Sequence, residues 1–83
     1  MDLQQIWNDV IQSFVESEKD ESKKALIQLL STQCTFTIKD NNVCFLCQND
    51  IAYKVIKLYA FDFHDAIKRM LGNNSLAMNI MMA

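Results

Sequence analysis

Proline is absent from this 83-residue sequence, and glycine occurs once, as Gly72. Turns and helix ends must therefore be made largely by Asn, Asp and Ser, whose side chains hydrogen-bond to the local backbone. These residue types mark the expected element boundaries. The sequence also has no apolar run of about 18 residues and no basic-then-apolar signal at its start, so we expect a cytoplasmic protein that makes no use of a membrane.

An excess of positive charge is also lacking. The formal net charge is −2 and the sequence pI is about 5.1. Without a global positive field to gather phosphates, nucleic-acid binding is expected to be weak or absent, and protein partners are favoured. Hydrophobic residues make up 51% and charged residues 22%, far from the composition of disordered chains. We therefore expect residues 1–83 to form one interaction domain.

Three cysteines, an odd number, favour reduced thiols that pack as small apolar groups. The Cys44-x-x-Cys47 spacing resembles a metal or redox motif, and Cys34 and His64 are the only further soft ligands to complete a zinc site. Residues three apart in a strand point to opposite faces, however, so the pair cannot easily share a metal. We expect no metal and no cofactor, with a zinc or redox protein as the alternative.

Helical spacing predicts two short helices at the start of the chain, joined by a polar connector over residues 17–22. The first spans about Asp2 to Glu16 and the second about Glu21 to Ser31, with an N-cap at Asp20 or Ser22. Ile27 lies off the apolar stripe expected for the second helix and is either a second packing contact or an exposed apolar patch. The apolar positions are Leu3, Ile6, Trp7, Val10, Ile11, Phe14 and Val15 in the first helix and Ala25, Leu26, Leu29 and Leu30 in the second.

The apolar period then changes to two, which predicts strands. Residues 34–38 alternate, residues 39–42 supply Asp and Asn for a turn, and residues 43–47 are apolar throughout, so we expect a β-hairpin with a well-covered second strand. Residues 75–82 alternate again and predict a third strand. Its apolar face would comprise Leu76, Met78, Ile80 and Met82.

The longest helical pattern lies between these strands, from Asp50 to Gly72. Asn49 or Asp50 is expected to cap its start, and Gly72 its end. The element order is then α-α-β-β-α-β, a small α+β domain with a three-stranded sheet covered by helices. The apolar face expected for the long helix is Ile51, Val55, Tyr59, Phe63, Ile67, Met70 and Leu71.

No combination of residues indicates catalysis, and we expect the protein not to be an enzyme. His64 has no nucleophile near it in sequence and is expected to be solvated, and Asp62 and Asp65 are ordinary helix-surface residues. Trp7 is a candidate anchor for a partner, because Trp is hard to bury fully in a small domain and is favoured at interface hot spots, and packing in the core is the alternative. Phe61 lies off the main stripe of the long helix and is either packed or part of a partner surface.

Several stretches resemble the N-terminal domain of the bacterial replication initiator DnaA. They are IWNDVI around Trp7, the hairpin TFTIKDNNVCFLC, the junction QNDIAYK, the later LYAFDFHDAIKRMLG and the closing SLAMNIMM. The junction of that family usually has Pro-Asn, an acidic residue, an aromatic residue and Ala, where this chain has Gln48, Asn49, Asp50, Ile51 and Ala52. A Phe and a Trp typical of the family's second helix are missing here.

The resemblance implies a KH-like fold and a protein-docking module of the replication machinery. Its first helix would contribute to self-association, and its second helix with the start of the third would bind a helicase, a helicase loader or an initiator regulator. The C-terminal domain of the tau subunit of DNA polymerase III shares the fold, and its partner would be a polymerase subunit. A KH-like domain that binds single-stranded nucleic acid is a further alternative, although the GXXG loop of such domains is missing. The partner-binding residues expected from the resemblance are Leu3, Ile6, Trp7, Val10, Lys24, Ile27, Gln28, Asn49, Asp50 and Lys54.

Overall fold

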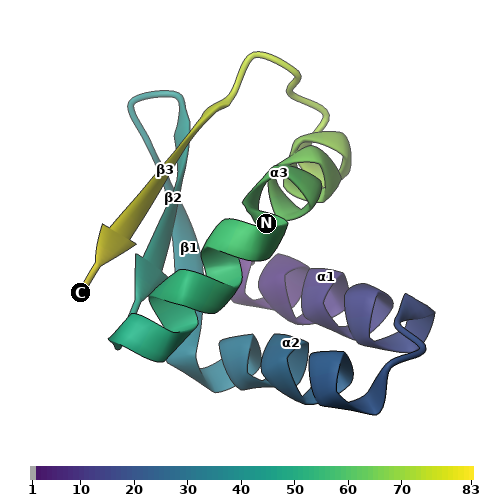
Figure 1. The fold of residues 1–83 in the computed structure, drawn as a ribbon. Helices are drawn as coiled ribbons and strands as arrows, with labels where there is room; N and C mark the ends of the chain where they lie inside the picture. The colour runs from purple at the N-terminus through teal and green to yellow at the C-terminus, as the bar shows by residue number, and fades with distance from the viewer. Residues whose placement is uncertain (1) are drawn as a thin grey trace.

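The computed structural model describes residues 2–83, and it confirms the predicted α+β fold and the order α-α-β-β-α-β. A layer of three helices packs against one face of a three-stranded sheet (Figure 1). The elements are α1 (Leu3–Ser17), α2 (Glu21–Gln33), β1 (Cys34–Lys39), β2 (Asn42–Cys47), α3 (Asp50–Leu71) and β3 (Ala77–Met82).

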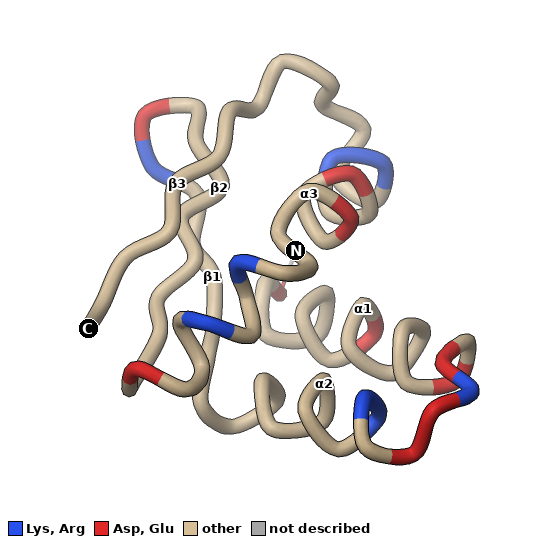
Figure 2. Tube along the Cα trace, viewed as in Figure 1, with Lys and Arg blue, Asp and Glu red and all other residues tan. Residues whose placement is uncertain are grey.

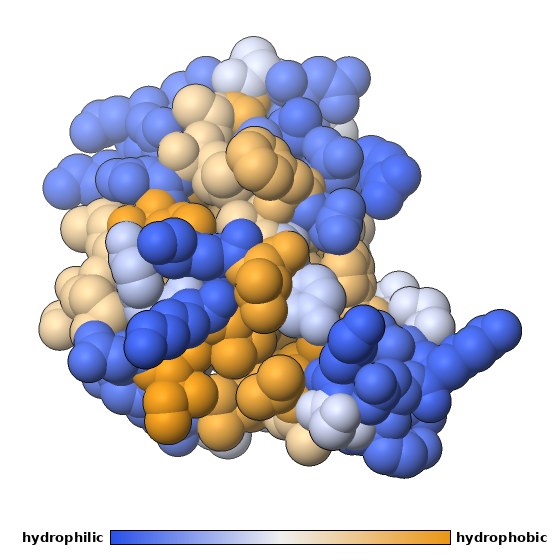
Figure 3. All heavy atoms as spheres, in the orientation of Figure 1, coloured by the Kyte–Doolittle hydropathy of each residue, from blue (hydrophilic) through white to orange (hydrophobic). Residues whose placement is uncertain are grey.

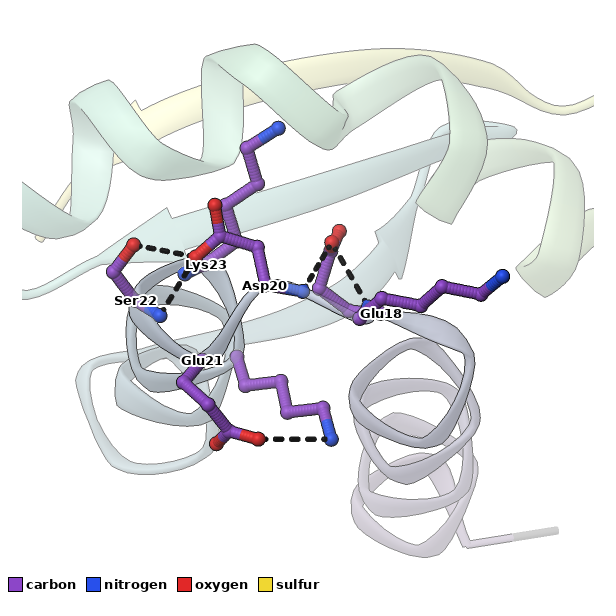
Figure 4. A network of polar contacts seen from close by, with 7 residues as sticks. Glu18, Asp20, Glu21, Ser22 and Lys23 are labelled. Atoms are coloured by element: carbon purple, nitrogen blue, oxygen red, sulfur yellow. Dashed lines mark hydrogen bonds and ion pairs between the residues drawn. The ribbon is translucent and has the colours of Figure 1, made fainter.

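Short polar residues start the helices, as expected. Asp2 caps α1, and the Asp20 carboxylate caps α2 by accepting hydrogen bonds from the main-chain N–H groups of Ser22, at 2.9 Å, and Lys23, at 3.4 Å. The carboxylate of Glu18 accepts from the N–H groups of Lys19 and Asp20, both at 3.1 Å, so the polar connector is internally bonded (Figure 4). The pKa of Asp20 is lowered, chiefly by its hydrogen bond from the Ser22 hydroxyl.

The β1–β2 hairpin turns through Asp40 and Asn41, which have φ values of 51° and 61°. Two left-handed residues between paired strands suit the right-handed twist of a hairpin. β2 is the central strand, antiparallel to β1 and parallel to β3, so α3 forms the crossover between β2 and β3. The prediction of a well-covered second strand is confirmed by burial of all but Asn42 and Leu46.

The buried face of α3 differs from the predicted one at its ends. Ile51 is exposed and Met70 is exposed, whereas Ala52, Ile56 and Ala60 are buried instead. The predicted row advanced mainly in steps of four, and each step overshoots a full turn by about 40°. Five such steps carry the row about 200° around the helix, so one end of it must leave the core.

The buried face of α2 was predicted only in part, since Leu30 is buried and Leu29 packs half-buried against the core as expected. Ala25 and Leu26 are exposed, while Ile27 and Leu30 are fully buried against α1 and α3. The stretch ALIQLL is apolar around most of the helix, so its pattern fits two stripes equally well. Tertiary packing selects the one that contains Ile27.

Trp7 lies in the centre of the core, so the core-packing alternative is confirmed and the expectation that Trp7 is too large to bury fully is wrong. The side chain is fully buried, and its ring packs on those of Phe36, Phe45 and Phe63 at centroid distances of 5.9, 5.9 and 5.5 Å. Its indole N–H donates to the main-chain oxygens of Leu30 and Cys34. A polar atom that finds partners inside the fold removes the usual reason for Trp to stay at the surface.

Gly72 and His64 determine how the chain leaves α3 and enters β3. Gly72 ends α3 in the left-handed conformation, with φ 66°. His64, which we expected to be solvated, is half-buried and lies 2.8 Å through Nε2 from the main-chain oxygen of Leu76. This contact fixes the buried Leu76 just before β3, whose last apolar residue, Met82, is exposed.

Candidate protein-interaction surface

The partner-binding residues predicted on α1 face the core. Ile6, Trp7 and Val10 are buried, and Leu3 is half-buried and packs against the core cluster. Ile6, Trp7 and Val10 therefore offer almost no surface to a partner in this structure. The amphipathic pattern of α1 reflects packing on α2, on α3 and on the sheet rather than an open apolar face.

The residues predicted on α2 and at the start of α3 divide into buried and accessible groups. Ile27 is buried, while Gln28, Asp50 and Lys54 are exposed. Lys24 is half-buried, with its Nζ 3.6 Å from the Glu21 carboxylate. Asn49 has a structural role: its Oδ1 accepts from the N–H of Ala52 at 2.9 Å as the N-cap of α3, and its Nδ2 donates to Gln33 at 2.8 Å.

The largest exposed apolar side chains lie on the outer face of α3. Ile51 is 62% exposed, Leu58 72% and Phe61 75%. Together with Lys54 and Asp65 they form one row in steps of three and four, which we call the outer stripe (Ile51, Lys54, Leu58, Phe61 and Asp65). Hydrophobic atoms gather along the course of α3, with hydrophilic atoms on both sides (Figure 3).

The sequence prediction missed Leu58 and assigned Ile51 to the core. The exposed face could have been predicted from a second row on α3. Steps of three and four residues lead from Ile51 through Lys54 to Leu58 and Phe61, and this row lies opposite the buried row that ends at Ile67. A helix with apolar residues on two opposite faces buries one face against its own domain and leaves the other face exposed.

Basic and acidic residues both occur along α3 (Figure 2). Lys57 Nζ lies 5.2 Å from the centre of the Tyr53 ring, which holds this cation on the neighbouring face of the helix. Lys68 Nζ lies 3.4 Å from Asp65 Oδ1. The basic residues of α3 are thus interleaved with acidic and aromatic groups and form no continuous positive surface.

Two shallow hollows lie elsewhere on the molecule. One, of about 310 Å³, lies between α1 and α3, and the other, of about 330 Å³, lies by the open face of the sheet and the hairpin turn. The first is mostly apolar and the second more polar, and neither groups residues for catalysis. Their lining residues are Asp9, Val10, Ser13, Phe14, Ala66, Arg69 and Met70 for the first and Lys39, Asp40, Asn42, Cys44, Met78, Asn79 and Met81 for the second.

The cysteines are placed as packing residues. Cys34 and Cys47 are partners across the hairpin, with their sulfur atoms 3.8 Å apart, and burial raises the pKa of both thiols. Cys44 lies outside the core cluster, so Cys44 and Cys47 point to opposite faces of the sheet, as predicted. Within residues 2–83 no group of three or more His, Cys, Asp or Glu side chains is arranged to hold a metal ion.

Comparison of the chain with protein-family models, with curated proteins and with solved structures finds no match. Among residues 2–83, no helix combines the length and the apolar composition required to cross a membrane.

Proposed function

We propose that this domain is a non-catalytic protein-interaction module of a bacterial DNA replication protein, resembling the N-terminal domain of the initiator. It would act in the cytoplasm, in self-association and in docking a helicase, a helicase loader or an initiator regulator. The assignment to DNA replication rests on the resemblance in sequence. The observation that carries the interaction role is the outer stripe of α3, where Ile51, Leu58 and Phe61 are each more than 60% exposed.

Exposed apolar side chains of this size have a cost, since they favour aggregation unless a partner covers them. Isolated surface apolar residues are common, but three in line on one helix match the way helical surfaces dock into partners. Lys54, Asp50 and Gln28 are also exposed, and they would supply the polar rim of such an interface.

The charge pattern favours a protein partner over nucleic acid. The net charge is −2, the connector between α1 and α2 is rich in acidic residues, and it has no glycine (Figure 2). Backbone contacts to single-stranded nucleic acid in KH domains need a GXXG loop, for which this chain has no counterpart. Titration of a labelled single-stranded oligonucleotide at low salt tests this directly, and salt-sensitive binding would overturn the proposal.

The direct test is titration of the isotope-labelled domain with the replicative helicase, its loader, an initiator regulator and the polymerase catalytic subunit of the source organism. We expect one of these proteins to perturb the backbone signals of α3, and Phe61→Ser to weaken that binding. Met82→Ser, a change at another exposed apolar residue, on β3 and outside the elements expected to dock, is the matched control. Binding to the polymerase subunit would indicate a tau-like parent protein. Failure of all four to bind would contradict the proposal.

A further inference from the structure

The outer stripe has the spacing of a coiled-coil seam. Its members follow one another in steps of three, four, three and four residues, the a and d positions of a heptad repeat. We propose that its occupant is a second copy of this chain, packed antiparallel through α3, with Leu58 of each copy against Phe61 of the other. This inference rests on the proposed function, in which the outer face of α3 binds protein, and it names the partner.

The charged members of the outer stripe select this arrangement. Leu58 and Phe61 are equally distant from a point between residues 59 and 60, and so are Lys54 and Asp65. A two-fold axis through that point therefore places each Lys54 opposite Asp65 of the second copy when it places Leu58 opposite Phe61. The seam is self-complementary in both its apolar and its charged layers, as an isologous interface requires.

A parallel pairing lacks this complementarity. It would place Lys54 against Lys54 and Asp65 against Asp65 of the second copy, and like charges in facing positions oppose association. In the antiparallel pair the two Lys54 side chains lie on the order of 16 Å apart along the helices, at 1.5 Å per residue. That separation exceeds the screening length of about 8 Å at physiological ionic strength, so their repulsion is small.

Neighbouring residues are compatible with the pairing. Lys68 contacts Asp65 through Oδ1, but the Asp65 side chain is 63% exposed, so its carboxylate is also accessible to Lys54 of the second copy. Ile51 and Lys68 are also equally distant from the axis, so the aliphatic stem of Lys68 would cover Ile51 of the second copy. One helix per copy makes an interface below about 1,200 Å², so the dimer is weak and concentration-dependent.

Sedimentation equilibrium of the 83-residue chain, from about 10 µM to about 1 mM, tests the dimer. We expect the average mass to rise from 9.6 kDa towards twice that value. Phe61→Ser should keep the chain monomeric over this range, while Leu26→Ser on α2 should associate as the unaltered chain does. Both side chains are exposed, so both variants should retain the native far-UV circular dichroism.

Charge reversal tests the antiparallel register. Lys54→Glu and Asp65→Lys should each weaken self-association about tenfold or more, because the two-fold axis repeats each change. An equimolar mixture of these two variants should form a heterodimer, since every Lys54–Asp65 layer then joins opposite charges.

Three results would overturn the inference. They are a monomer at every concentration, a dimer that survives Phe61→Ser, and a mixture of the two charge variants that associates no better than either alone. If the chain stays monomeric but Phe61→Ser still abolishes binding to a replication protein, this inference fails and the docking role of the proposed function stands. If the chain forms a dimer of the expected register but binds no replication protein, this inference stands and the docking role fails.

Discussion

The indole Nε1 of Trp7 donates a hydrogen bond of 2.9 Å to the main-chain oxygen of Cys34, which lies 27 residues away. Cys34 is the residue at which α2 ends and β1 begins, so this bond joins α1 to the corner of the helix layer and the sheet. A second bond, of 3.2 Å, reaches the oxygen of Leu30. Trp7 therefore joins α1, α2 and β1 within the core.

Trp7→Ala should destabilise the domain by about 3–5 kcal/mol, through loss of a large buried side chain and the cavity left behind. Trp7→Phe should cost about 1–3 kcal/mol, because the carbonyl groups lose a donor while most of the packing remains. Urea unfolding measures both losses. It is followed by far-UV circular dichroism because Trp7 is the only tryptophan, so neither variant retains tryptophan fluorescence. Phe61→Ala, at an exposed site, should stay within about 0.5 kcal/mol. A Trp7→Ala variant of native stability would contradict the core role.

Local signals in the sequence predicted the element boundaries well. The caps at Asp20, Asn49 and Gly72 depend on a side chain and its own neighbouring backbone, so the chemistry is visible in the sequence. The same holds for the left-handed turn at Asp40 and Asn41.

The choice of buried face was less predictable, because it depends on packing between distant segments. Ile27 rather than Leu26 enters the core because Trp7 and Leu30 meet there. Leu58 and Phe61 have the same apolar character as core residues, and only the arrangement of α3 on the sheet leaves them outside. The contact of His64 with Leu76 likewise depends on the path of the chain after α3.

Gly72→Ala should destabilise the domain by about 1 kcal/mol. Its φ is 66°, and a Cβ built at this position meets no atom within 4 Å, so the cost is the left-handed backbone alone and not a clash. Gly72→Asn should cost less, because Asn tolerates that conformation. Thermal unfolding of the three proteins checks the order Gly, Asn, Ala. Equal losses for Asn and Ala would show that something other than φ sets the cost.

Asn49→Ala should destabilise the domain by about 1 kcal/mol, since α3 loses its N-cap. Asn49→Asp is the matched control: a carboxylate can still accept from the N–H of Ala52, but it cannot donate to Gln33 Oε1. We expect the Asp variant to lie between the unaltered chain and the Ala variant in urea unfolding. If Asn49→Ala leaves stability unchanged, its side chain is free for the partner role implied by the resemblance.

The facing thiols of Cys34 and Cys47 should make stability fall as the pH rises above about 8.5, the pKa of a cysteine in an unfolded chain. Burial raises the pKa of both thiols in the folded state, with the nearby Cys47 adding to the effect at Cys34. Their protonated forms therefore contribute stability that is fully present below that pH. Above it the unfolded chain loses protons that the folded chain retains.

The free energy of unfolding should then decrease by up to about 1.4 kcal/mol per pH unit for each thiol. Urea unfolding between about pH 8 and pH 10 measures this slope, below the range in which lysine and tyrosine ionise fully. The double variant Cys34→Ala/Cys47→Ala is less stable because of its cavities, but its slope should be flatter. Cys44→Ala, on the other face of the sheet, should retain the slope of the unaltered chain. An unchanged slope in the double variant would assign the pH dependence to other groups.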